Sequence, residues 1–205
     1  MDDTSIDTIT VSGIDEEWAE WASLDSFGSL STDTIDIIPP KLYVWKLWEE
    51  AHLPEYGSEW AACFDLKASL RDIDEVSVYT QTNVKEKRKV VDKCLYLAKG
   101  ERMLVPTGLV FDLSEGESIR IHPRSGLSLK NGIVVANCEG VVDADYVQQT
   151  YVMLHNISTE TFCIKDGDRI AQAEVAYGYQ YEITETDREP EEKTSRKGGF
   201  GSTGV

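Results

Sequence analysis

The sequence predicts an all-β protein of the sandwich or jelly-roll class, and three features of its 205 residues support this prediction. Short apolar or alternating runs recur from residue 42 to residue 184. Turns rich in Gly, Asp, Asn or Pro separate these runs, as at Lys99-Gly100-Glu101. No long helical period follows residue 58. The hydrophobic fraction of 41% is enough for one core, so we expect one β domain with additions.

The first expected strand covers residues 42–47, which are rich in β-branched and aromatic side chains. Further strands are expected wherever apolar residues cluster or alternate: at 95–97, 103–105, 109–113, 118–121, 133–136, 151–154, 170–175 and 180–184. One short helical turn is expected at residues 125–130. Together these elements define a β core over residues 41–190.

Residues 71–94 are expected to form a charged, protruding hairpin inserted into this core. Strand-like ends at 76–79 and 90–91 flank a polar middle at 81–83, and the basic run Lys85-Glu86-Lys87-Arg88-Lys89 precedes the second end. A solvated hairpin tip is the simpler interpretation of the basic run. Contact with an acidic partner or with the acidic extension is the alternative.

Residues 1–40 form an acidic N-terminal extension. They hold ten Asp or Glu residues and no Lys or Arg, and they end in Pro39-Pro40. Trp18 and Trp21, three residues apart, would share one face of a short helix. The extension is therefore either a docking segment for a protein partner or a solvated tail, and both interpretations stay open.

The composition narrows the class of function. A net charge of −17 argues against binding long nucleic acid, which requires many cations, whereas one small nucleotide needs few. No apolar run has membrane-spanning length and no signal peptide is recognisable, so a soluble cytoplasmic protein is expected. The four Cys and three His residues show no metal-ligand spacing, so any metal would be held by oxygen atoms.

Residues 191–205 are expected to be a glycine-rich C-terminal arm. Four glycines in the run 198–204 leave backbone amides free to wrap an anion, and Phe200 has no local partner for its ring. Such an arm suits a nucleotide, because amides and hydroxyls can contact phosphates while the ring covers a base.

Two internal segments carry further candidate site residues. In His122-Pro123-Arg124-Ser125-Gly126-Leu127, Arg124 offers a planar fork for phosphate, and Ser125 and Gly126 open a helical turn with free amides. In residues 137–146, the side chain of Asn137 can pair with a base edge, and Asp143 can activate water as a general base.

In their residues and in their order along the chain, five segments resemble the motifs of the trimeric, all-β dUTP diphosphatase (dUTPase) family, which has phage and viral members. The resemblance covers roughly residues 41–205 and implies a dUTPase-like jelly roll. Its five motifs are Ala61-Ala62-Cys63-Phe64-Asp65-Leu66, Pro123-Arg124-Ser125-Gly126-Leu127, Gly140-Val141-Val142-Asp143-Ala144-Asp145-Tyr146, Gly167-Asp168-Arg169-Ile170-Ala171-Gln172 and Gly198 to Gly204.

This resemblance implies hydrolysis of dUTP to dUMP and pyrophosphate, which keeps uracil out of DNA and supplies dUMP for dTMP synthesis. Asp143 matches the general base whose water attacks the α-phosphate. Mg²⁺ would be held by the triphosphate and water, with Asp65 near it indirectly. The active sites would be shared between the subunits of a homotrimer, in the cytoplasm or, for a phage or viral protein, in the host cytoplasm.

The resemblance also assigns the substrate contacts. Asn137, with Gly140 in the same hairpin, matches the residues that read uracil, and Tyr146 matches the ring under the deoxyribose. The phosphate contacts in the body correspond to Ser125 and Gln172, with Arg124 and Gly126 beside them. In the arm, Ser202 and Thr203 match phosphate ligands, Phe200 matches the ring that closes over the base, and Gly201 lies between them as a further substrate-binding residue.

Three positions depart from the family pattern. Ser195 stands where the arm usually has arginine, so Arg196 is expected to take over the γ-phosphate contact. Cys63 and Gln148 stand where glycine is usual. The activity is nevertheless expected to be retained.

Two rival functions remain at this point. A dCTP deaminase would need a glutamate in the hairpin segment, where residues 142–146 hold none. A non-catalytic, dUTPase-like regulatory binding protein would bind its partner through the extension or the 71–94 insertion, and the acidic 1–40 segment is the feature that supports it. Deleting residues 1–40 and measuring turnover separates an enzymatic role of the extension from a partner role.

Overall fold

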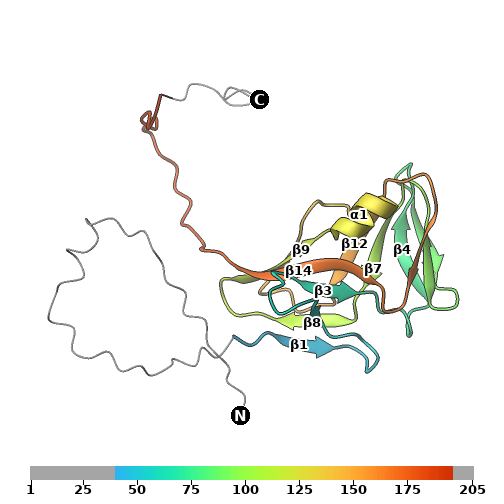
Figure 1. Ribbon diagram of the computed structural model, residues 1–205. Coiled ribbons are helices and arrows are strands. Elements are labelled where there is room, and N and C mark those ends of the chain that lie inside the picture. Colours follow the sequence, from blue (N-terminus) through green and yellow to red (C-terminus); the bar gives the residue numbers. More distant parts are fainter. Residues whose placement is uncertain (1–39, 196–205) are drawn as a thin grey trace, which may run out of the picture. The chain divides into compact units, whose positions relative to one another are not determined.

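The computed structural model describes residues 40–195, which contain fourteen strands and one short helix, α1 (Ser125–Asn131) (Figure 1). The all-β prediction is therefore confirmed. Within this range, no helix is long and apolar enough to cross a membrane. The expected helix around Trp18 and Trp21 and the arm residues from Arg196 onward lie outside the described residues.

One five-stranded antiparallel sheet has the order β10-β12-β7-β4-β5. Its strands are β10 (Ile133–Val135), β12 (Tyr151–Asn156), β7 (Arg102–Pro106), β4 (Glu75–Tyr79) and β5 (Lys85–Lys89). The predicted charged hairpin is β4 and β5, so the second strand is the basic run itself and not residues 90–91. The hairpin also extends a core sheet, because Val78 of β4 pairs with Met103 of β7.

The second five-stranded antiparallel sheet has the order β11-β9-β14-β3-β2. Its strands are β11 (Gly140–Asp143), β9 (Glu117–His122), β14 (Arg169–Tyr177), β3 (Phe64–Lys67) and β2 (Glu55–Tyr56). Two smaller pairs are β1 (Tyr43–Lys46) with β8 (Leu109–Asp112), and β13 (Phe162–Lys165) with β6 (Cys94–Leu97).

Alternation along the strands separates the core from the polar face of the second sheet. Ile119 and Ile121 of β9 are buried, whereas the intervening Arg120 lies on the opposite face. In β3, Phe64 and Leu66 are buried on either side of Asp65. The candidate site residues Asp65 of β3 and Gln172 of β14 consequently share the outer face of this sheet with His122 of β9.

Most expected strands are confirmed, as is the helical turn at 125–130, but the strand expected at 180–184 is wrong. In the described chain these residues pair with no strand, and Tyr179, Tyr181 and Ile183 are 88%, 81% and 97% exposed. A strand requires a neighbour for its backbone groups, and none of the described elements supplies one here. Strands β2, β3, β11 and β13 were not among the expected strands, since they are short or lie within motif segments.

Candidate active site

One pocket of about 270 Å³ gathers the residues expected to read the base and to attack the phosphate. Asn137, Gly140, Asp143 and Tyr146 all line it, and apolar residues of β7, β10 and β12 complete its wall. A mostly apolar pocket with a few polar groups is typical of small-ligand sites. The structure therefore brings together four residues that stand within ten positions of the sequence. The hairpin expected around Gly140 is wrong, because β10 pairs with β12 in one sheet and β11 pairs with β9 in the other.

The loop between β10 and β11 is held in a tight turn. Cys138 has a φ of 64°, its amide donates to the Val135 carbonyl at 3.0 Å, and the Glu139 amide donates to the Asn137 carbonyl at 2.7 Å. A Cβ at Gly140 would lie 3.1 Å from the Cβ of Ile121, so glycine permits the close approach of β11 to β9. This turn fixes Asn137 at the pocket.

Asp143 ends β11 with an exposed carboxylate that forms no ion pair within residues 40–195. The Tyr146 amide donates to the Asp143 carbonyl at 3.1 Å, and the Tyr146 hydroxyl donates to the Gln149 carbonyl at 3.0 Å. The tyrosine is thereby fixed beside an unpaired carboxylate. An unpaired, exposed carboxylate is available to accept a proton from water.

A second hollow lies on the other side of Asp143 and is strongly acidic. Its lining includes Glu115, Glu117 and Asp145 besides Asp143, with Arg120 as the one cation among the described residues that line it. The Tyr177 hydroxyl donates to the Glu117 carboxylate at 2.7 Å, and this hydrogen bond lowers the pKa of Glu117, with help from the Ser114 backbone. The carboxylate therefore stays ionised, and a triphosphate would be repelled from this side.

A separate cluster on β3, β14 and the start of α1 collects the expected phosphate contacts. Both oxygens of Asp65 are paired, Oδ1 with Arg124 Nε at 2.9 Å and Oδ2 with Arg169 Nη1 at 3.1 Å. The Arg124 guanidinium also donates to the Arg169 carbonyl at 3.2 Å. Two guanidinium groups are thus held side by side around one carboxylate, which favours an anion at their outer face.

Gln172, Ser125 and Gly126 belong to this same region. The Gln172 side-chain amide donates to the Pro123 carbonyl at 3.1 Å, so β14 positions the segment that leads into α1. Ser125 and Gly126 are exposed at the start of α1, and no atom lies within 4 Å of a Cβ built on Gly126. The space next to these residues is open to a ligand or to a second chain.

The base pocket and the phosphate cluster lie far apart on one chain. Asp143 of β11 pairs with Ser118 of β9. Asp65 of β3 pairs with Gln172 of β14, which pairs with His122 of β9. His122 is four residues beyond Ser118, and β3 is three strands away from β11. Strand geometry then separates the two carboxylates by about 13 Å along the strands and about 14 Å across them, or roughly 20 Å in all. The base pocket and the phosphate cluster of one chain are therefore separate regions of the second sheet.

Sequence reasoning missed Arg169 and His122 as site neighbours. Arg169 lies in the same motif, residues 167–172, as the predicted Gln172, so that motif could have pointed to it. The His122 ring lies 3.2 Å from Glu174 and 3.7 Å from Glu139, so it links β14 to the turn beside Asn137. Such partners come from distant strands and leave no local pattern.

Cys63, which stands at a position where glycine was expected, does not supply a reactive thiolate. Burial, together with the negative charge of Glu174, raises the pKa of the Cys63 thiol. The thiol is therefore neutral near pH 7, and nucleophilic cysteine chemistry is not indicated here.

Comparison with known proteins identifies the family. The dUTPase family model matches residues 89–204, which is more than half of the chain. Among curated relatives, the deoxyuridine 5'-triphosphate nucleotidohydrolase of Caulobacter vibrioides is 38% identical over 173 residues, covering 82% of this chain and 98% of the relative. The protein of the same name from Rhizobium etli is 40% identical over 170 residues, with 82% and 96% covered.

Solved structures show a shared fold. A mutant dUTPase of Staphylococcus bacteriophage 80alpha, solved with dUpNHpp, matches with a TM-score of 0.63 at 19% identity, covering 82% of this chain and all of that one. A mutant dUTPase from phage phi11 of S. aureus, described with a structural Mg(II) ion, matches with a TM-score of 0.57 at 18% identity, covering 73% and 98%. The chain has a dUTPase-like jelly roll and belongs to the dUTPase family.

Proposed function

We propose that this protein is a dUTP diphosphatase, which hydrolyses dUTP to dUMP and pyrophosphate. The observation that carries the proposal is the pocket that joins Asn137, Asp143 and Tyr146. Relatives named deoxyuridine 5'-triphosphate nucleotidohydrolase align over 82% of the chain, so this pocket lies in a segment shared with them. The activity keeps uracil out of DNA and provides dUMP for dTMP synthesis.

In the proposed mechanism, Asp143 takes a proton from a water molecule, and the resulting hydroxide attacks the α-phosphorus. Asn137 pairs with the edge of uracil, and the ring of Tyr146 packs under the deoxyribose, where it excludes a 2′-hydroxyl. The carboxylate suits this role because it is exposed and unpaired in the described chain. Pyrophosphate then leaves from the side opposite the water.

We further propose that each active site is assembled from neighbouring subunits of a homotrimer. About 20 Å separates Asp65 from Asp143 within one chain, by strand geometry, and the hollow beside Asp143 carries carboxylates that repel phosphate. A second chain can place its Arg124, Arg169 and Gln172 where the triphosphate lies. The alternating, exposed Tyr179, Tyr181 and Ile183 after β14 support this assembly, because a neighbouring subunit can cover them.

We propose Mg²⁺ as the cofactor, bound mainly by the triphosphate and water. The described residues contain no group of three His, Cys, Asp or Glu side chains that could hold a metal ion. Both oxygens of Asp65 are already paired with arginines, so this residue fits an indirect role through water and not direct coordination. When bound, Mg²⁺ neutralises and orients the phosphates for in-line attack.

The decisive experiment measures pyrophosphate release from dUTP, dCTP, dTTP and UTP with Mg²⁺ present, and assays ammonia release from dCTP in parallel. Turnover of dUTP well above the other three nucleotides is expected, since the pocket is proposed to read uracil and to exclude a 2′-hydroxyl. Ammonia release from dCTP would instead establish a deaminase. A folded protein that turns over none of these nucleotides would contradict the proposal and favour a regulatory binding protein.

The substitution Asp143→Asn tests the general base. We expect binding of the non-hydrolysable analogue dUpNHpp to persist, and kcat to fall about 10²–10⁴-fold because water is no longer deprotonated. Single-turnover measurements check the chemical step. Asp145→Asn changes a carboxylate that lines the neighbouring acidic hollow and is the matched control. Its kcat should fall much less than that of Asp143→Asn. Near-normal turnover of Asp143→Asn would refute the assignment.

A further inference from the structure

We infer that the outer edge of β5 is a docking site for an extended acidic segment of a partner protein. Among the described strands, β5 is the last of its sheet and has β4 as its one ladder partner. It contains the basic run that the proposed nucleotide chemistry does not use. The inference goes beyond the proposed function and rests on backbone geometry and charge.

The hydrogen-bonding pattern of the hairpin shows which backbone groups are free. Amides donate from Thr80 to the Val84 carbonyl at 2.9 Å and from Val90 to the Asp74 carbonyl at 2.8 Å. Hydrogen-bonded pairs alternate in an antiparallel ladder, so Glu86 and Arg88 also point their backbone groups at β4. The N–H and C=O groups of the three intervening residues, Lys85, Lys87 and Lys89, consequently point away from the sheet.

The side chains of the same three lysines share one face of β5, because side chains alternate along a strand. All three are exposed. Lys87 pairs with Glu75 at 3.1 Å, and no ion pair within residues 40–195 involves Lys85 or Lys89. Arg102 adds a cation on this face, lying 5.9 Å from the ring centre of Tyr79. The free backbone groups and the positive charges therefore belong to the same positions.

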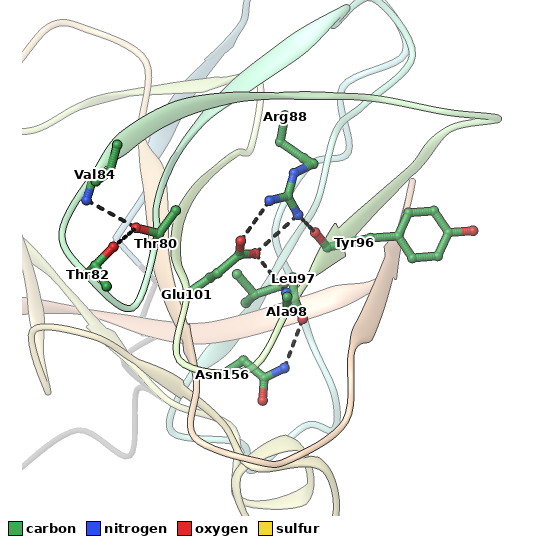
Figure 2. Close-up of polar contacts among 9 residues, drawn as sticks. All are labelled: Thr80, Thr82, Val84, Arg88, Tyr96, Leu97, Ala98, Glu101 and Asn156. Carbon is green, nitrogen blue, oxygen red and sulfur yellow. Dashed lines mark hydrogen bonds and ion pairs between the residues drawn. The ribbon is translucent and has the colours of Figure 1, made fainter.

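Side-chain hydrogen bonds anchor β5 and the hairpin turn to their neighbours. Arg88, on the opposite face, donates to both Glu101 carboxylate oxygens at 2.7 and 3.1 Å and to the Tyr96 carbonyl at 2.6 Å (Figure 2). At the hairpin turn, the Val84 amide donates to the Thr80 hydroxyl at 3.1 Å (Figure 2). A preorganised edge lowers the ordering cost of binding a strand.

These features define the chemistry of the partner. A strand added to β5 places every second residue opposite a lysine on the lysine face, about 6.8 Å apart. An extended segment with Asp or Glu at alternate positions fits this spacing. Single-stranded nucleic acid fits less well, because its bases need several free rings to stack on, and Arg102 covers one face of Tyr79.

Edge lysines also have a purely protective role, since they discourage edge-to-edge aggregation of sheets. The test therefore measures binding of a fluorescein-labelled (Glu-Thr)5 peptide to the full chain by fluorescence anisotropy, at low and high salt. The same peptide N-methylated at each glutamate keeps the charge but loses the amides that would pair with β5. A (Lys-Thr)5 peptide and a ten-residue oligothymidylate complete the set of probes.

The triple variant Lys85→Gln, Lys87→Gln and Lys89→Gln is compared with a matched control that removes three other exposed lysines, Lys41→Gln, Lys130→Gln and Lys165→Gln. We expect saturable binding of (Glu-Thr)5, weakened about tenfold or more in the β5 variant and less than about threefold in the control. N-methylation should remove saturable binding, and added salt should weaken it.

Four results would overturn the inference. The first is that (Glu-Thr)5 does not bind, and the second is that both triple variants lose affinity for it equally. The third is that the N-methylated peptide binds as well as (Glu-Thr)5. The fourth is that the oligothymidylate binds more tightly than (Glu-Thr)5 and depends on the β5 lysines. Sedimentation of the β5 variant supplies a further check. If that variant self-associates while the original chain binds no peptide, the lysines only protect the edge.

Discussion

At the scale of single residues, the structure distinguishes two buried threonines at one crossing of strands. The Thr107 hydroxyl donates to the Thr150 carbonyl at 2.6 Å and accepts the Leu109 amide at 3.2 Å. The Thr150 hydroxyl is equally buried, at the wall of the base pocket, and has no hydrogen-bond partner among the described residues. The threonine hydroxyl is therefore hydrogen-bonded at position 107 and lacks a partner among the described residues at position 150.

This contrast predicts opposite effects of the same substitution. Thr150→Val should leave stability unchanged or raise it by up to about 1 kcal/mol, because an unpaired hydroxyl is replaced by a methyl group. Thr107→Val should cost about 1–3 kcal/mol, because the Leu109 amide loses its acceptor. Denaturant unfolding of the two variants checks this. A large loss in Thr150→Val would show that its hydroxyl has a partner in the assembled protein.

At the scale of elements, one ion pair ties the charged hairpin to the core. Glu101, which is 8% exposed, accepts two hydrogen bonds from Arg88 of β5 and one from the Ala98 amide at 2.8 Å (Figure 2). Asn156 of β12 joins the same region, because its side chain donates to the Leu97 carbonyl at 2.8 Å. The basic run is thus partly structural, through Arg88, and partly exposed, through its lysines.

Removing the cation alone should be costly. Arg88→Met leaves the Glu101 carboxylate buried without its charged partner, and we expect a loss of about 2–4 kcal/mol in unfolding free energy. Adding Glu101→Gln should recover part of that loss, because the neutral amide oxygen can still accept the Ala98 amide. A denaturant-based double-mutant cycle measures the coupling. Additive effects of the two changes would argue against the pair as the anchor.

At the scale of the whole molecule, the separation between base pocket and phosphate cluster predicts complementation between inactive chains. Asp143→Asn disables the pocket, and the double variant Arg124→Ala with Gln172→Ala disables the cluster. Each alone should be nearly inactive. Co-refolded in equal amounts, they should regain up to about a quarter of the normal turnover, because random mixing unites two intact halves in about that fraction of sites.

The control for this experiment is mixing without refolding, which should restore nothing while subunits stay associated. A mixture that remains inactive after co-refolding, although both variants assemble normally, would place the complete site within one chain. Sedimentation of each preparation establishes its assembly independently of activity.

Much of the fold was predictable because its signals are local. Alternation marks β9 and an apolar run marks β12. The motif residues Asn137, Gly140, Asp143 and Tyr146 stand within ten positions, so the loop and strand of one short segment bring them to one pocket. The strand expected at 180–184 failed for a non-local reason. Its alternating pattern is real, but a strand forms only where a neighbour offers backbone partners, and the described chain offers none there.

Short segments of the sequence were enough to predict the all-β class and the dUTPase family, because strand patterns and motif residues are local features. They also pointed to Asn137, Gly140, Asp143 and Tyr146, which line one pocket. Long-range packing places Asp65 between Arg124 and Arg169, the latter 104 residues away, and joins β4 and β5 to a core sheet. Those outcomes depend on the register between distant strands. Register is set by which faces are buried together, and no single segment encodes it.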